Sequence, residues 1–217
     1  MITDYHSHVL PGVDDGIRTT DEALGVLAHL EREGLEALWL TPHIMEDVPN
    51  RTKELRERFA ELQDAYHGSI RLSLAAEYML DSLFTERLAS RDLLPIGERG
   101  DYLLVETSYF TPPMDLDGLL ERIRSAGYFP ILAHPERYFY MGHSEYQRLL
   151  AAGVKFQLNL GSVVGTYGKE VRRKANWLLR RNAYSIAGSD LHRERMIDSI
   201  LSYRHPSRIH PLLDANL

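Results

Sequence analysis

The chain has 217 residues, of which 44% are hydrophobic and 26% are charged. These fractions are typical of a globular protein, and they exclude collagen-like, disordered and membrane-embedded classes. Asp and Glu number 31 against 25 Lys and Arg, so the formal net charge is −6. Because an acidic chain offers no positive surface to a phosphate backbone, we expect no nucleic-acid partner.

The sequence contains no cysteine. Disulfides, thiolate metal ligands and any mechanism with a cysteine nucleophile are therefore excluded. The first residues lack the cationic start and apolar stretch of a signal peptide, and no later run approaches the roughly 18 apolar residues of a membrane span. We expect a cytoplasmic protein without membrane insertion.

Short segments rich in β-branched and aromatic residues alternate with longer segments of helical period. The short segments predict seven strands, approximately Met1–Tyr5, Ala37–Thr41, Arg71–Ala76, Tyr102–Glu106, Phe129–Ala133, Val154–Leu160 and Tyr184–Ala187. This alternation is typical of parallel βα units. No low-complexity linker or repeat of 20–50 residues interrupts it. The sequence therefore predicts an α/β protein, with residues 1–217 folded as a single barrel of βα units.

The predicted helices have recognisable start and stop signals. Thr19 and Glu22 form a capping box ahead of an apolar stripe, and Gly34 ends that stripe. The next stripe runs over residues 55–66, and a later one over 119–123 ends before Gly127. Further helices are expected after Asp81, Ser144 and Gly168.

Imidazole and carboxylate side chains gather where the predicted strands end. Five of the ten histidines and three carboxylates fall there, on every strand but the sixth: His6, His8, His43, Glu77, Glu106, His134, Asp190 and His192. In a βα barrel the carboxyl ends of the strands meet at one end and carry the catalytic groups. Nitrogen with carboxylate oxygen is a ligand set for zinc, manganese or iron. The sequence therefore predicts a site for several metal ions.

Each of these residues also has a structural explanation. A lone histidine is more often a half-buried polar residue than a ligand. The spacing of His6 and His8 supports the metal hypothesis, because residues two apart on an extended segment project to the same side. A buried carboxylate is unfavourable without a cation or a full set of hydrogen bonds. A helix N-cap for Glu77 and an arginine ion pair for Glu106 are the alternatives.

Two further features lie beside these strand ends. The Asp-Asp-Gly sequence at 14–16 is typical of a turn, yet one aspartate could face inward because the histidine pair is in the same loop. Arg137 follows His134 by three residues, close enough to aim its guanidinium at a metal-bound oxyanion. Arg193 and Arg195 flank the last candidate ligands in the same way.

The chain resembles the CpsB/CapC (YwqE-type) phosphatases of the PHP superfamily in six segments, which are, in order, HSHVLPGVDDG, TPH, AEY, VET, AHPERY and GSDLH. They span nearly the whole chain, and HSHxLPGxDDG with AHPERY is more characteristic of this family than of PHP proteins in general. The resemblance implies the PHP fold, a single-domain, distorted TIM-like (β/α)7 barrel, which agrees with the seven strands counted above.

The resemblance also implies a metal-dependent protein-tyrosine phosphatase. Its substrate would be phosphotyrosine on an autophosphorylating bacterial tyrosine kinase that regulates capsular or exopolysaccharide biosynthesis. Three divalent metal ions are implied, manganese first, with iron and zinc as alternatives. Carried over by motif, the ligand sets are His6, His8, Glu77 and Asp190 for one ion; Glu77, as a bridge, with Glu106 and His134 for the second; and Asp15, His43 and His192 for the third.

The sequence departs from the family pattern in the position of its second phosphate-binding arginine. Arg137 matches the phosphate-binding arginine of the HPER element. The family carries a second arginine somewhat beyond the SDxH element, whereas here the segment HRERMID offers Arg193 and Arg195 at shorter spacing. Both are candidates for that second role.

The expected reaction is in-line attack on phosphorus by a metal-activated hydroxide, without a covalent intermediate. A small-molecule PHP phosphoesterase, such as a histidinol-phosphate phosphatase, is the first alternative, and it would enclose its substrate more deeply than a peptide phosphatase. An amidohydrolase-like barrel would normally need a lysine at a strand end, and a non-catalytic kinase-docking module would normally have lost ligands. An ion-paired network without metal lacks enough basic partners.

Aromatic residues lie near the expected mouth of the site. They are Tyr109, Phe110, Tyr138, Phe139 and Tyr140. Such rings could stack on a phosphotyrosine ring or simply pack the loops, and the sequence does not distinguish the two.

Overall fold

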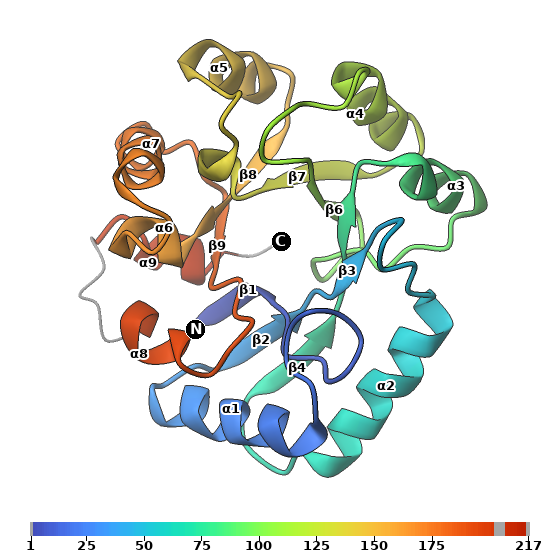
Figure 1. The fold of residues 1–217 in the computed structure, drawn as a ribbon, viewed down its shortest axis with the longest axis vertical. Coiled ribbons are helices and arrows are strands. Elements are labelled where there is room, and N and C mark those ends of the chain that lie inside the picture. The colour runs from blue at the N-terminus through green and yellow to red at the C-terminus, as the bar shows by residue number, and fades with distance from the viewer. Residues whose placement is uncertain (1, 202–206, 216–217) are drawn as a thin grey trace.

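The structure, a computed structural model, describes residues 2–201 and 207–215. Parallel strands form a ring that is surrounded by helices (Figure 1). The strands are β1 (Thr3–Ser7), β2 (Ala37–Leu40), β3 (His43–Ile44), β4 (Arg71–Leu74), β5 (Glu77–Met79), β6 (Tyr102–Glu106), β7 (Phe129–Ala133), β8 (Lys155–Asn159) and β9 (Ile186–Gly188). The helices are α1 (Thr20–Arg32), α2 (Thr52–Ala65), α3 (Ser82–Ser90), α4 (Leu116–Ser125), the 3₁₀ turn η1 (Pro135–Arg137), α5 (His143–Ala151), α6 (Leu160–Val164), α7 (Lys169–Leu179), α8 (Met196–Leu201) and α9 (His210–Leu213).

Two parallel sheets make up the ring, one in the order β1-β2-β4 and the other β3-β5-β6-β7-β8-β9. β2 continues into β3 across Thr41 and Pro42, and β4 continues into β5 across two alanines. Proline has no N–H to donate, so it interrupts the ladder at this point. The Glu77 N–H still donates to the Pro42 carbonyl, at 3.1 Å. The nine strands of the described residues therefore make seven strand segments, as the sequence predicts.

The ring closes between β1 and the segment that follows β9. The Asp190 N–H donates to the His6 carbonyl at 2.7 Å, and the His8 N–H donates to the Leu191 carbonyl at 3.0 Å. Gly188 lies against β1 so closely that a Cβ there would stand 2.4 Å from the Cβ of His6. A glycine is therefore required for this approach. The predicted distorted (β/α)7 barrel is confirmed.

The predicted strand boundaries are correct where no irregularity intervenes. The strands over residues 102–106 and 129–133 have the predicted bounds. The first predicted strand is shifted, because β1 runs to Ser7, and Met1 lies outside the described residues. The second and third predicted strands end early because each passes from one sheet to the other. The last one starts two residues later than predicted.

The helix signals in the sequence are confirmed apart from Ser144, which lies inside its helix rather than before it. Thr19 caps α1 in the expected capping box with Glu22, and Asp81 and Gly168 are the N-caps of α3 and α7. The helix expected after Ser144 begins at His143. Within the part of the chain that the structure describes, no helix is both long and apolar enough to cross a membrane.

A small apolar cluster fills the ring below the polar strand ends. It consists of Tyr5, Ala75, Ile96, Leu104, Ile131, Ala133 and Ile186. Alternate residues of the same strands, such as Leu103, Val105 and Leu132, belong to the larger cluster with the helices. The strands therefore place one set of side chains inside the ring and the other under the helices, as barrel strands do.

Candidate metal centre

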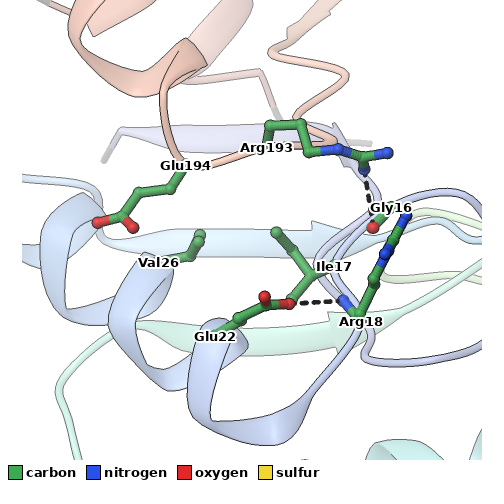
Figure 2. A pocket seen from close by; sticks show the side chains of 7 residues that line it. All are labelled: Gly16, Ile17, Arg18, Glu22, Val26, Arg193 and Glu194. Atoms are coloured by element: carbon green, nitrogen blue, oxygen red, sulfur yellow. Dashed lines mark hydrogen bonds between the residues drawn. The ribbon is translucent and has the colours of Figure 1, made fainter.

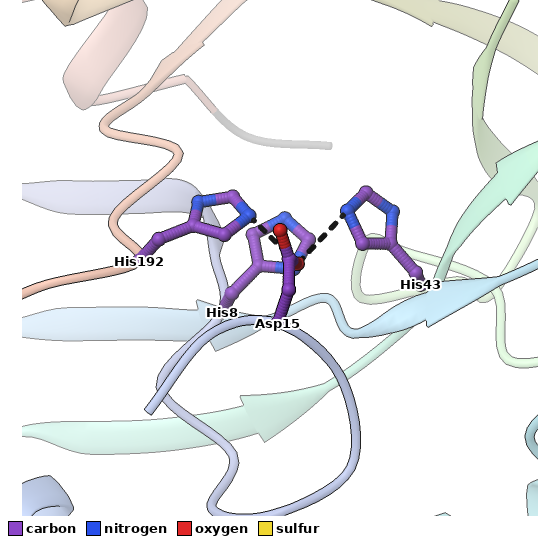
Figure 3. Close-up of side chains that lie close together, drawn as sticks. All are labelled: His8, Asp15, His43 and His192. Atoms are coloured by element: carbon purple, nitrogen blue, oxygen red, sulfur yellow. Dashed lines mark ion pairs between the residues drawn. The ribbon is translucent and has the colours of Figure 1, made fainter. Parts of the chain in front are cut away.

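All nine predicted metal ligands meet at the carboxyl end of the ring. Their ligand atoms form four overlapping groups, each within 4.8 Å: His8, Asp15, His43 and His192; His6, His134 and Asp190; His6, His8 and Glu77; and His43, Glu77 and Glu106. Figure 3 shows the first group, in which the Asp15 carboxylate stands between His43 and His192. A cavity of about 340 Å³ opens onto the cluster.

Local irregularities of the strands aim these side chains. β1 carries one extra residue between Asp4 and Ser7 relative to β2. Such a bulge changes the alternation of a strand, so the neighbours Tyr5 and His6 both face into the ring. The break at Pro42 lets His43 pair directly opposite Glu77 in the β3–β5 register. His134 and Asp190 follow their strands with φ values of 34° and 54°, which are strained for residues other than glycine.

Glu77 stands at the centre of the cluster. Its Oε2 atom lies 3.2 Å from His6 Nε2, 3.4 Å from His8 Nε2 and 3.2 Å from His43 Nδ1. Both this oxygen and His43 Nδ1 are buried, and neither has a hydrogen-bond partner among the described residues. Buried polar atoms are nearly always satisfied, and a cation between this oxygen and this nitrogen would satisfy both. The donor set therefore fits divalent metal ions.

Three histidines are held so that their Nε2 atoms face the cluster. His6 Nδ1 lies 3.1 Å from Gln157 Oε1, and His8 Nδ1 lies 2.8 Å from Asp14 Oδ2. His192 Nδ1 lies 2.9 Å from the Asp190 carbonyl oxygen. Each acceptor can receive a hydrogen bond from Nδ1–H, and a neutral imidazole held in this way carries its lone pair on Nε2. Metal-ligating histidines in proteins are typically oriented in this way.

The charges of the cluster depend on one another. Burial alone lowers the pKa of His6, but the facing Glu77 and Asp190 carboxylates outweigh it and raise that pKa to about 9. Burial likewise opposes ionisation of Glu77 and Asp190, yet His6 holds the pKa of each carboxyl below its ordinary range. The site therefore stabilises positive charge at the point where the imidazole nitrogens meet.

Arg137 lies in the wall of the same cavity. Its Nη1 donates to Asp190 Oδ2 at 2.5 Å, and its guanidinium lies between two rings, 4.6 Å from the centroid of Tyr109 and 4.2 Å from that of Tyr167. Burial lowers the pKa of Arg137, but Asp190 raises it above its usual value. A fixed planar cation beside the cluster suits recognition of a phosphate group.

The other two arginine candidates lie elsewhere. Arg193 Nη1 donates to the carbonyls of Asp15, Gly16 and His192, and so joins the loop after β1 to the loop after β9. Figure 2 shows it at the edge of a separate pocket of about 290 Å³. Arg195 is exposed. Among the described residues that line the larger cavity, Arg137 is the only arginine.

The observed groups differ in part from the ligand sets that the family resemblance implies. His134 Nε2 lies 3.0 Å from Glu77 Oε1 but 3.9 Å from Glu106 Oε2, and it also groups with His6 and Asp190. His8 joins the group of Asp15, for which the resemblance implies only two histidines. The ligand groups overlap, so the nine side chains form one continuous cluster.

Several functional side chains were not predicted. Gln157 and Asn159 lie on β8, the strand for which the sequence predicts no ligand, and Asn159 Nδ2 donates to Asp190 Oδ2 at 2.9 Å. Asp14, beside the predicted Asp15, is buried and holds both His8 and the His43 N–H. A signal for the two amides was present in the sequence. Gln157 and Asn159 alternate with Phe156 and Leu158, and in a strand this alternation places both amides on the inner face.

Residues 2–200 match a family described as capsular polysaccharide synthesis, CpsB/CapC. The chain is 25% identical to the tyrosine-protein phosphatase YwqE of Bacillus subtilis over 195 residues. The matched region covers 87% of this chain and 76% of YwqE. It is 27% identical over 202 residues to the tyrosine-protein phosphatase CpsB of Streptococcus pneumoniae, covering 87% of this chain and 82% of CpsB.

Solved structures share the fold. One comes from crystal structures of YwqE from Bacillus subtilis and CpsB from Streptococcus pneumoniae, described as metal-dependent tyrosine phosphatases. It matches with a TM-score of 0.82 at 22% identity, over 99% of this chain and 95% of that chain. The lactonase Lmo2620 from Listeria monocytogenes matches with a TM-score of 0.58 at 11% identity, over 98% and 83%. The family match, which spans nearly the whole chain, confirms the resemblance, and this chain belongs to the CpsB/CapC family.

Proposed function

We propose that this chain is a metal-dependent protein-tyrosine phosphatase, and hence a phosphoric monoester hydrolase. One observation carries the proposal: five imidazoles and four carboxylates meet at a cavity whose wall also carries the Arg137 cation. A cation-binding cluster beside an anion-binding arginine is the arrangement that hydrolysis of a phosphate monoester needs. The relatives YwqE and CpsB, which are named tyrosine-protein phosphatases, support the same activity.

The donor set suits manganese, iron or zinc, and we propose three ions, with manganese as the first candidate. Bound divalent ions supply an acidified water and neutralise charge on the phosphate. The guanidinium of Arg137 then holds phosphate oxygens through the donors that Asp190 does not engage. A tyrosinate leaving group, with a pKa of about 10, departs with less help from an acid than an alkoxide does.

The substrate we propose is phosphotyrosine on an autophosphorylating bacterial tyrosine kinase in the cytoplasm. The description of the family as capsular polysaccharide synthesis supports a kinase that regulates capsule or exopolysaccharide production. The names of the relatives support a phosphotyrosine substrate. The absence of cysteine fits a reaction without a covalent phosphocysteine.

The test measures phosphate release from a phosphotyrosine peptide and from histidinol phosphate. The metal-stripped protein is assayed alone, with manganese and with zinc. We expect release from the peptide that depends on the added metal. A preference for histidinol phosphate would replace the proposed function with that of a small-molecule phosphoesterase.

A matched pair of variants tests the site assignment in the same assay. Glu77→Gln removes the central carboxylate and should lower kcat by at least about 100-fold, because weaker changes around metal ligands already cost 10–100-fold. Glu86→Gln, on the exposed face of α3, makes the same chemical change away from the cluster and should act like wild type. Normal activity of Glu77→Gln would refute the assignment.

A further inference from the structure

An exposed apolar surface lies on the rim of the proposed catalytic cavity. Phe110 and Phe139 are 72% and 62% exposed, and their rings stack with centroids 5.4 Å apart and planes inclined by 24°. Met114, in the same loop as Phe110, is also fully exposed. We call the pair Phe110 and Phe139 the aromatic rim. With Met114 they are three of the five large hydrophobic side chains that are exposed within residues 2–201 and 207–215.

The aromatic rim is fixed relative to the phosphate-binding arginine. Phe110 directly follows Tyr109, whose ring covers Arg137, and Phe139 stands two residues after Arg137. The Phe139 N–H donates to the Tyr109 carbonyl at 2.8 Å, which joins the loop after β6 to the segment after η1. A phosphotyrosine bound at Arg137 would therefore place its flanking residues next to the aromatic rim.

Two open grooves extend this surface away from the cavity. One of about 380 Å³ includes Phe139 and Lys174, and another of about 240 Å³ includes Met114. Both are lined by Tyr140 and Met141, so they meet there. A small phosphate metabolite is enclosed by one pocket, whereas open grooves beside an exposed aromatic pair suit an extended polypeptide.

The charged side chains of the grooves are already engaged. Lys174 Nζ donates to the Tyr138 carbonyl at 2.7 Å, Arg173 pairs with Glu170 at 2.6 Å, and Arg148 pairs with Asp117. The surface therefore offers apolar carbon and aromatic faces rather than free charge. The matching chemistry is an apolar or aromatic side chain.

We infer that the aromatic rim binds an apolar side chain close to the phosphotyrosine in a protein substrate. The inference rests on the proposed phosphatase function and adds to it a binding site for a residue beside the phosphotyrosine. The rim is tied to Tyr109, which lines the cavity that would hold the phosphotyrosine, and this favours the substrate chain over a second copy of the protein as the occupant.

The test compares three substrates and three variants. The substrates are a phosphotyrosine peptide with leucine beside the phosphotyrosine, the same peptide with glycine there, and p-nitrophenyl phosphate. The variants are Phe110→Ala, Phe139→Ala and their double. Phe129→Ala is the control, because Phe129 is 50% exposed at the opposite, amino end of β7. Each protein is assayed with manganese, and its oligomeric state is measured by light scattering.

We expect the double variant to lose about tenfold in kcat/KM on the leucine peptide, mainly through KM, since partial burial of two phenyl groups is lost. Its kcat/KM on p-nitrophenyl phosphate should stay at the wild-type value. An unchanged value on the leucine peptide would overturn the inference, and so would an equal loss on all three substrates. A double variant whose oligomeric state changes while its kcat/KM on the peptides does not would also overturn the inference.

The same experiment separates the inference from the function on which it rests. A wild-type protein that hydrolyses none of the three substrates would refute the proposed function, and the inference with it. A wild-type protein active on all three, together with a double variant that is equally active on the leucine peptide, would overturn the inference alone.

Discussion

Gln157 orients two histidines of the metal centre at once. Its Oε1 atom lies 3.1 Å from His6 Nδ1 and accepts the His134 N–H at 3.1 Å, and the side chain is fully buried. Gln157 is not itself a candidate ligand, because its Oε1 atom is already engaged by the His6 ring and the His134 backbone. Gln157 therefore fixes the tautomer of His6 and the backbone position of His134.

Replacing this amide should weaken metal binding while the fold is kept. Gln157→Leu, which is close in size, removes the acceptor, and we expect the affinity for manganese to fall by about 10–100-fold. Competition with a chelating dye measures that affinity. Gln147→Leu, at an exposed position of α5, is the control and should bind manganese like wild type. Equal affinities for the two variants would mean that Gln157 has only a structural role.

The two rings around Arg137 should fix its orientation. Tyr167→Leu removes one aromatic face, whereas Tyr167→Phe keeps that face and loses only the hydroxyl, which lies 3.3 Å from Asn159 Nδ2. We expect Tyr167→Leu to raise the inhibition constant of inorganic phosphate by about tenfold. This factor corresponds to the free energy of one cation–π contact. Tyr167→Phe should stay close to wild type. Steady-state inhibition assays measure both, and the same effect in both variants would contradict this role for the ring.

A site residue could be predicted from the sequence where a local pattern marks it, and could not where its role depends on a partner distant in sequence. His43 and Glu77 could be predicted because each follows a predicted strand, a local pattern, although the structure places them at the starts of β3 and β5. Gln157 could not, since its partner His6 lies 151 residues away and meets it only when β8 and β1 share the ring. The guanidinium of Arg193 shows the reverse case: local spacing suggested a phosphate ligand, and distant backbone carbonyls hold it instead.

The seam between β1 and β9 is the element on which the site most depends. It is held by backbone hydrogen bonds at the level of His6 and Asp190, both of them predicted ligands. The bulge in β1 turns His6 inward at the same level. Any change that separates the two strands therefore moves ligands of one cluster apart.

Gly188→Ala tests this seam. Its new Cβ would stand 2.4 Å from the Cβ of His6, so the strands must shift, and we expect the free energy of unfolding to fall by about 1–3 kcal/mol. Manganese affinity should fall with it. Gly25→Ala is the control, because nothing lies within 4 Å of a Cβ on that face of α1, and alanine favours a helix. Urea unfolding measures both variants, and a Gly188→Ala protein as stable as wild type would contradict the account of the seam.

The sequence predicts where the seven strand segments lie, but it does not predict that two of them are each divided between the two sheets. The period-two and β-branched signals mark all seven segments, but they carry no information on which sheet a residue joins. β2 and β4 leave one sheet, and β3 and β5 enter the other, at Pro42 and at the two alanines before Glu77. The strained backbone of His134 and Asp190 was equally hidden, because surrounding contacts rather than local preference impose it.

At the scale of the whole molecule, the metal centre connects parts of the chain that are remote in sequence. Its nine candidate ligands come from residue 6 to residue 192, on or just after six different strand segments. Arg193 adds a direct link between the loops after β1 and β9. The cluster exists only when the ring is closed, so cations that bind it bind the folded state alone.

Divalent ions should therefore stabilise the folded protein. At a free manganese concentration 100 times the dissociation constant, binding to the native state alone contributes about 2.7 kcal/mol. Thermal unfolding of the metal-stripped protein across a manganese series should show a rising midpoint, and excess chelator should reverse it. Glu77→Gln should reduce the rise, because it removes the carboxylate that four imidazoles share, whereas Glu86→Gln should keep it. A midpoint that does not depend on manganese in the wild type would mean that the cluster is a preformed ion-pair network, with imidazolium charges in place of metal.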